Sequence, residues 1–240
     1  MSKRLEKYRR LWSVKPQILS IYNDYFTRIV SACTSGTTLE IGGGIGNFAS
    51  FVDNVISIDI QLDAELDVIG DAHAIPFKNA SFSNIVMLDV LHHLESPVQF
   101  FKEAQRVVCS GGRIVILELA ITPLSGIFYR FFHHEPVIMD VDPFDIASQN
   151  ADRDPYEANQ AIPTLLFKNH LNRLSTEFPE LKVLKTQLIS LFAYPLSGGF
   201  RTWSLLPTKI IPALLRFEEK LLPALGPLMA FRYLIVIERK

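Results

Sequence analysis

The stretch Thr37-Thr-Leu-Glu-Ile-Gly-Gly-Gly-Ile-Gly-Asn-Phe48 decides how this chain is expected to fold. Residues 37–41 read as an apolar strand that runs into glycines 42, 43, 44 and 46, and a helix is expected over residues 47–52. Glycine allows a sharp turn at the end of a strand and lets a ligand approach the backbone without a Cβ in the way. Because ligands of open α/β sheets bind at the carboxyl ends of the strands, the turn predicts both the fold class and the binding edge.

Outward from this turn, strands and helices alternate at short spacing over residues 37–120, which predicts a parallel sheet with crossover helices. The expected strands are residues 55–59, 67–70, 84–88 and 113–119, followed later by 183–192 and 233–238. The expected helices are residues 3–33, broken near Pro16, then a helix capped by Ser96 and ended by Gly111-Gly112, and residues 163–178. We interpret residues 1–240 as one domain with N-terminal helices (1–36), a core (37–122) and two cap insertions (123–182 and 193–232).

The composition excludes several classes of protein. With 48% hydrophobic and 20% charged residues among 240, the chain has ample apolar surface for a folded core. Two cysteines exclude a disulfide scaffold, and a net charge of −1 argues against a nucleic-acid partner. No apolar run is long enough to span a bilayer and no secretory signal is recognised, so a cytoplasmic location is expected. The basic ends, residues 1–15 and 201–240, leave open either solvated helix faces or peripheral contact with anionic lipid.

Three acidic residues narrow the choice of ligand for the glycine turn. Residues 44–49 alone fit the dinucleotide pattern G-x-G-x-x-A, whereas residues 40–46 fit E-x-G-x-G-x-G. Asp59 ends the second strand, where a carboxylate can accept both hydroxyls of a ribose, and Asp71-Ala72 can read an adenine edge through a carboxylate and a backbone N–H. Glu40, ahead of the glycines, suits a ligand with an ammonium group and disfavours a pyrophosphate.

Four motifs follow in order: Leu39–Phe48 with Asp59, Asp71-Ala-His-Ala-Ile-Pro-Phe77, Phe82–Leu94, and Gly111-Gly-Arg-Ile-Val-Ile116. Over residues 35–120 the chain resembles class I S-adenosylmethionine-dependent methyltransferases of the type 11 group. The resemblance implies a Rossmann-like, seven-stranded, mostly parallel sheet with helices on both faces, a last strand that runs antiparallel, and S-adenosylmethionine as cofactor with S-adenosylhomocysteine as product. Two departures are Ser83, where the group often has Asp, and the short spacing from Asp59 to Asp71, which implies a missing or reduced helix.

The resemblance also implies roles for individual residues. Glu40 and glycines 42, 44 and 46 are expected to line the methionine part of the cofactor. Asp59 is expected to hold the ribose and Ile60 to pack on the adenine, whose edge Asp71 and Ala72 would read. Leu88, through its carbonyl, and Asp89 are expected near the sulfonium.

Histidines are the candidate general bases, since an oxygen acceptor needs a group that takes up a proton near neutral pH. His92 and His93 follow the fourth strand, and His133 and His134 lie in the aromatic insertion; structural roles for both pairs stay open. No metal site is expected, because adjacent histidines point apart in an extended chain.

The acceptor is expected to be a small molecule, a saccharide or a lipid-linked compound, methylated on oxygen or carbon. Aromatic residues of 128–132 and 194–203 would form its apolar pocket, and the segment 205–231 suits a lipid-facing cap, ordinary packing or a homodimer contact. Two rival interpretations remain: a protein that binds the cofactor without turnover, and a nicotinamide-dependent oxidoreductase, against which Glu40, Asp59 and Asp71 speak.

Overall fold

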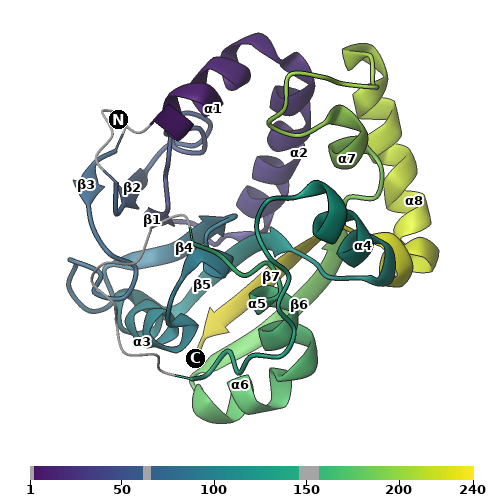
Figure 1. Cartoon of the computed structure of the whole chain (residues 1–240). Coiled ribbons are helices and arrows are strands. Elements are labelled where there is room, and N and C mark those ends of the chain that lie inside the picture. The colour runs from purple at the N-terminus through teal and green to yellow at the C-terminus, as the bar shows by residue number, and fades with distance from the viewer. Residues whose placement is uncertain (1–2, 62–65, 146–156) are drawn as a thin grey trace.

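The computed structural model describes residues 3–61, 66–145 and 157–240, which form a seven-stranded sheet (Figure 1). The strand order is β3-β2-β1-β4-β5-β7-β6. The strands are β1 (Thr38–Ile41), β2 (Val55–Asp59), β3 (Val68–Ile69), β4 (Phe82–Leu88), β5 (Val108–Leu119), β6 (Leu181–Ile189) and β7 (Arg232–Arg239). The strands from β1 to β5 pair in parallel, while β7 lies antiparallel between β5 and β6. The predicted seven-stranded, mostly parallel sheet with an antiparallel last strand is therefore confirmed.

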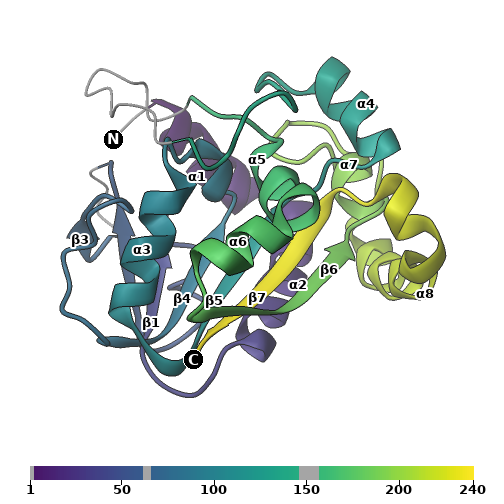
Figure 2. The ribbon, with the colours of Figure 1, turned by 90° about the horizontal axis from the view of Figure 1, so that it is seen from below.

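Helices cover both faces of this sheet, as the two views in Figures 1 and 2 show. The helices are α1 (Lys3–Val14), α2 (Pro16–Ala32), α3 (Pro97–Val107), α4 (Pro123–Phe132), α5 (Ile162–Thr164), α6 (Leu171–Glu177), α7 (Ala193–Ser197) and α8 (Ile211–Met229). Shorter helical turns are η1 (Leu91–His93), η2 (Leu165–Asn169) and η3 (Thr208–Ile210). One face carries α3, α5 and α6, and the other carries α2, α7 and α8.

The two faces follow from the alternation of side chains along each strand. In β5, Ile114 and Ile116 belong to the core under α3 and α6, whereas Val115 and Leu117 belong to the core under α2 and α8. Because all four are fully buried, the strand reads as a continuous apolar run, which is typical of a central strand covered on both sides. Glu118, at the end of this run, is also fully buried.

Two details of the predicted elements are wrong. Residues 47–52 form turns with isolated helical hydrogen bonds, such as Ser50 N to Gly46 O at 3.1 Å, and no α-helix is assigned there. Positive φ angles at Gly44 and Gly46 keep the chain out of the helical region just before this segment. The helix α3 ends at Val107, and Gly111 and Gly112 lie inside β5 at a shift in its register with β4.

Lys15 connects the break between α1 and α2 to the distant loop after α7. Its buried ammonium donates to the carbonyl oxygens of Gly199, Arg201 and Trp203 at 2.6, 2.7 and 2.9 Å. Loop residues of this kind need their backbone groups satisfied when they are covered by other segments. Lys15 thereby fixes the loop that forms one wall of the cavity described next.

Candidate functional site

A cavity of about 680 Å³ opens at the carboxyl ends of β1, β2 and β4, where the glycine turn lies. This volume falls within the range of small-molecule binding sites. Its walls also include residues of α1 and α2, of the segment after α4, and of α7 and its loop. Segments far apart in the sequence therefore meet over the strand ends.

Nine of the ten predicted cofactor-binding residues line this cavity: Glu40, Gly42, Gly44, Asp59, Ile60, Asp71, Ala72, Leu88 and Asp89. The remaining one, Gly46, is absent from the lining; its backbone N–H donates to Gly43 O at 2.9 Å and its φ is 72°. Gly46 therefore shapes the turn instead of facing the cavity. The four candidate bases His92, His93, His133 and His134 line the same cavity.

The glycine turn is held against the end of β2. Gly42 and Gly43 both donate their N–H groups to Ile58 O, at 2.8 and 3.1 Å, and Gly44 N–H donates to Asp59 Oδ2 at 3.0 Å. Gly44 has a φ of 57°, and a Cβ on it would meet Gly42 O at 3.9 Å and nothing closer. A side chain there would therefore project into open space at the cavity wall.

Glu40 stands below the turn and is 7% exposed. Its Oε2 accepts a hydrogen bond from the Ser57 hydroxyl on the neighbouring strand. Burial raises the pKa of the Glu40 carboxyl to about 7, and the charges of Asp59 and Asp67 act in the same direction. The group therefore changes its charge near neutral pH.

The two aspartates after β2 and β3 are held by local backbone groups. Asp59 accepts from Gly44 N–H through Oδ2 and from Gln61 N–H through Oδ1, at 3.0 and 2.9 Å. Asp71 Oδ1 faces the backbone N–H and the Nδ1 of His73, at 2.9 and 2.8 Å. The helix between Asp59 and Asp71 was expected to be missing or reduced. This expectation concerns a segment that includes residues 62–65, which lie outside the described residues.

Asp89 forms an ion pair that the sequence did not reveal. It has a φ of 57° and contacts the guanidinium of Arg232, with Nη2 to Oδ2 at 2.9 Å and a second contact from Nη1 to Oδ1. Arg232 is 1% exposed and lies over the rings of Tyr25 and Tyr194. The only signal in the sequence was the position of Arg232, a cation directly before the predicted apolar strand 233–238. Its partner Asp89 is 143 residues away along the chain.

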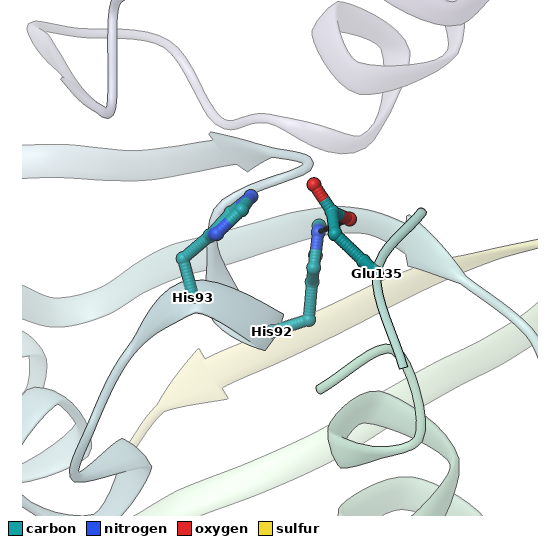
Figure 3. Close-up of side chains that lie close together, drawn as sticks. All are labelled: His92, His93 and Glu135. Carbon is teal, nitrogen blue, oxygen red and sulfur yellow. Dashed lines mark ion pairs between the residues drawn. The ribbon is translucent and has the colours of Figure 1, made fainter. Parts of the chain in front are cut away.

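The cavity lining also includes a cluster of histidines around two carboxylates. His92 Nδ1 lies 2.8 Å from Oε2 of the buried Glu118, and His92 Nε2 lies 3.5 Å from Oε2 of Glu135 (Figure 3). Burial disfavours the charged imidazole, but the two carboxylates outweigh burial and raise the pKa of His92 to about 10. Glu118 was missed in the sequence, where the signal was a carboxylate inside the apolar run of β5.

The other three histidines surround Glu135 or stack on His92. The rings of His92 and His93 have centroids 4.2 Å apart, and burial together with the charge of His92 lowers the pKa of His93 to about 4. His133 Nδ1 and His134 Nε2 lie 3.7 and 3.4 Å from Glu135 oxygens, and burial lowers the pKa of His133 to about 4. The structure therefore brings both predicted histidine pairs together at one carboxylate.

Residues 39–116 match the sequence model of a family described as "Methyltransferase domain". An uncharacterized protein of Methanocaldococcus jannaschii is 32% identical over 104 residues, which cover 40% of this chain and 51% of that protein. The chain thus matches about half the length of this curated relative.

Solved structures of several methyltransferases share the fold at low sequence identity. A SAM-dependent methyltransferase from Archaeoglobus fulgidus is 14% identical, with a TM-score of 0.56 over 93% of this chain and 94% of that chain. A SAM-dependent methyltransferase from Thermotoga maritima, described as a possible histamine N-methyltransferase, is 13% identical, with a TM-score of 0.54 over 98% and 95%. Geranyl diphosphate C-methyltransferase from Streptomyces coelicolor A3(2), in complex with Mg²⁺, geranyl diphosphate and S-adenosyl-L-homocysteine, is 13% identical, with a TM-score of 0.53 over 91% and 79%.

Proposed function

Residues 39–116 match a family of methyltransferase domains, and from this premise we propose that the chain is a class I S-adenosylmethionine-dependent methyltransferase that transfers a methyl group to oxygen or carbon of an organic acceptor. The observation that carries the proposal is one cavity lined by two chemically different groups of residues. One group is the glycine turn with Glu40, Asp59 and Asp71, and the other is the histidine cluster around Glu135. We infer that the first group binds the cofactor and the second the acceptor.

The residues around the glycine turn fit an adenosyl group joined to an amino acid. The Cβ-free position of Gly44 leaves room at the cavity wall, and Asp59 presents a carboxylate beside it for a ribose. Glu40 supplies an acid for an ammonium group, and Asp71 with the Ala72 backbone would read the adenine. A pyrophosphate, in contrast, would meet the Glu40 carboxylate, which speaks against a nicotinamide cofactor.

S-adenosylmethionine, when bound, supplies a methyl group already activated by the positive sulfonium. The chain then has mainly to hold the acceptor in line with that methyl group and to exclude water. Leu88 and Asp89 would lie beside the sulfonium, and the histidines beyond them would take up or hold the proton of an acceptor hydroxyl. Residues 123–182 and 193–232 would act as the cap; residues 146–156 of this cap lie outside the described residues.

A lipid-linked acceptor is supported by an apolar surface on α4, next to the cavity wall. Ile127 and Phe131 lie one helical turn apart and are 56% and 73% exposed. Leu205, 71% exposed, follows the loop in which Arg201 donates to Phe132 O at the end of α4. Apolar side chains mixed with arginines are typical of contact with an anionic membrane surface.

No helix within the described ranges has both the length and the apolar character that a membrane span requires. A small-molecule or saccharide acceptor remains the alternative within the same activity. The homodimer and the cytoplasmic location expected from the sequence stay predictions.

Methyl transfer can be tested with S-adenosylmethionine that carries a labelled methyl group, offered with a lipid extract or with an aqueous extract of cells. The proposal predicts label in the lipid fraction, and no label with an Asp59→Ala variant. Label in the aqueous fraction alone would contradict the lipid-linked acceptor but keep the activity. Binding of S-adenosylhomocysteine without transfer to either extract would support the rival, a binding protein without turnover.

The membrane contact has its own test, by sedimentation with phosphatidylglycerol vesicles. A Phe131→Asp variant should lose most of the vesicle-bound fraction. Ile69→Asp is the matched control, because Ile69 is 54% exposed on the edge strand β3, away from α4. Equal binding of both variants would refute the assigned surface.

A further inference from the structure

His92 faces a carboxylate at each of its two ring nitrogens, Glu118 at Nδ1 and Glu135 at Nε2. Glu118, which is fully buried, lies 2.8 Å from His92 Nδ1 and therefore fixes the proton on that nitrogen. Nε2 lies 3.5 Å from Oε2 of Glu135. A cation is therefore held between Nε2 and this carboxylate, and a metal ion bound there would displace the Nε2 proton.

We propose that His92, His93 and Glu135 form a binding site for a divalent transition-metal ion of the zinc class in the lining of the cavity. One ligand atom from each of the three residues lies within 4.8 Å of the other two. The side chains converge from two separate segments: both histidines come from η1, and Glu135 comes from the segment after α4 (Figure 3).

The distances fit a tetrahedral site after a small adjustment. With metal–ligand bonds of about 2.0–2.1 Å, neighbouring ligand atoms of a tetrahedron are about 3.3 Å apart. The His92–Glu135 distance of 3.5 Å is close to this value. His93 is only partly buried, so its ring has room to close the remaining distance of up to roughly 1.5 Å. Two imidazoles and one carboxylate leave a fourth position open, as in catalytic zinc sites.

The surroundings of the three ligands resemble the outer shell of a metal site. A carboxylate that holds the far nitrogen of a ligating histidine is the usual support for such a ligand, and Glu118 is so placed. Gln160, which is fully buried, donates to Glu135 Oε2 at 3.4 Å, while its own Oε1 has no hydrogen-bond partner among the described residues.

This inference revises the expectation that no metal binds. From the sequence, adjacent histidines are expected to point apart in an extended chain. His92 and His93 instead lie in the 3₁₀ turn η1, where their ring centroids are 4.2 Å apart. Glu135 completes the group from 42 residues further along, a contact that spacing alone does not reveal.

The role of the ion rests on the proposed methyl transfer. Its open position would face the cavity and bind an acceptor oxygen, and a bound cation lowers the pKa of a hydroxyl so that it loses its proton near neutral pH. In that arrangement His92 and His93 serve as ligands, which leaves His133 and His134 as the candidate bases.

Metal binding is tested directly by titrating Zn²⁺ into chelator-treated, tag-free protein and measuring heat and stoichiometry. We expect one Zn²⁺ per chain, with affinity at least about 100-fold lower in Glu135→Gln and in His93→Ala, since even outer-shell losses cost 10- to 100-fold. His170→Ala is the matched control, because it removes an imidazole that does not line the cavity, and it should leave the affinity unchanged. X-ray absorption at the zinc edge should show two imidazole ligands.

The inference is overturned if no stoichiometric Zn²⁺ binds, or if Glu135→Gln and His93→Ala bind it as tightly as the unchanged chain. It is also overturned if His134→Ala abolishes binding while His93→Ala does not. S-adenosylhomocysteine is titrated into the same samples. If S-adenosylhomocysteine binds and Zn²⁺ does not, the metal site is refuted and the proposed function stands. If Zn²⁺ binds and S-adenosylhomocysteine does not, the result counts against the proposed function.

Discussion

Cofactor affinity should rise with pH because of Glu40. The pKa of this buried carboxyl is raised from 4.5 to about 7, so most of it is protonated at pH 5.5 and most is ionised at pH 7.5. If only the carboxylate pairs with the ammonium group of the ligand, the ionised fraction rises from about 0.03 to about 0.76 between these values. We therefore expect S-adenosylhomocysteine to bind about 25-fold more tightly at pH 7.5, which corresponds to about 2 kcal/mol.

The measurement is calorimetric titration of S-adenosylhomocysteine at both pH values, with two variants. Glu40→Gln keeps the size of the side chain but cannot ionise, so its affinity should be low and independent of pH. Asp67→Asn removes one of the charges that raise the pKa of Glu40, so its pH midpoint should shift downward. Equal affinity of the unchanged chain at both pH values, or the same slope in Glu40→Gln, would refute the role of Glu40.

The stability of the ligand-free protein should change in the opposite direction. A carboxyl whose pKa is higher in the folded than in the unfolded state binds more protons when folded, so stability falls as pH rises from 4.5 to about 7. The shift corresponds to about 3 kcal/mol at most. Urea denaturation should therefore show that Glu40→Gln removes this part of the pH dependence, and unchanged pH dependence would contradict the raised pKa.

Three further predictions concern the turn and the buried ion pair. Gly44→Ala and Gly111→Ala both place a side chain at positive φ, at a cost of about 1–2 kcal/mol each. Only Gly44→Ala should abolish most S-adenosylhomocysteine binding, because Gly44 lines the cavity, whereas Gly111 lies outside it and its Cβ would meet nothing within 4 Å. Equal binding by the two variants would show that Gly44 does not face the ligand. Asp59→Ala should lose most of the affinity in the same titration, and an affinity within twofold of the unchanged chain would remove Asp59 from the site. Asp89→Asn leaves the guanidinium of Arg232 buried without its anion and should cost about 3 kcal/mol or more in urea denaturation, partly restored by adding Arg232→Met; a loss below about 1 kcal/mol would contradict the buried pair.

The sheet and the glycine turn at the cavity were predictable because their signals are local. The glycine turn, the acids at strand ends and the apolar runs all lie within a few residues of the structure that they specify, and Glu40, Asp59 and Asp71 do line one cavity. Residues 47–52 were predicted wrongly, because the helix signal there competes with positive φ at two glycines. Helix and turn patterns differ little over six residues.

The histidine cluster was predictable only in part, because its contacts join distant segments. The histidine pairs stood out in the sequence, but Glu118 and Glu135 meet His92 from β5 and from the segment after α4. Arg232 reaches Asp89 from the first residue of β7. Such pairings follow from the strand order, which places β5 between β4 and β7, and no local periodicity encodes them.

The central claim, that the cavity binds S-adenosylmethionine at the glycine turn, is tested most directly by parallel calorimetric titrations of the unchanged chain with S-adenosylhomocysteine and with NAD⁺. The structure predicts one molecule of S-adenosylhomocysteine bound per chain, more tightly than NAD⁺, because Glu40 favours an ammonium group over a pyrophosphate. Absence of S-adenosylhomocysteine binding, or tighter binding of NAD⁺, would contradict it.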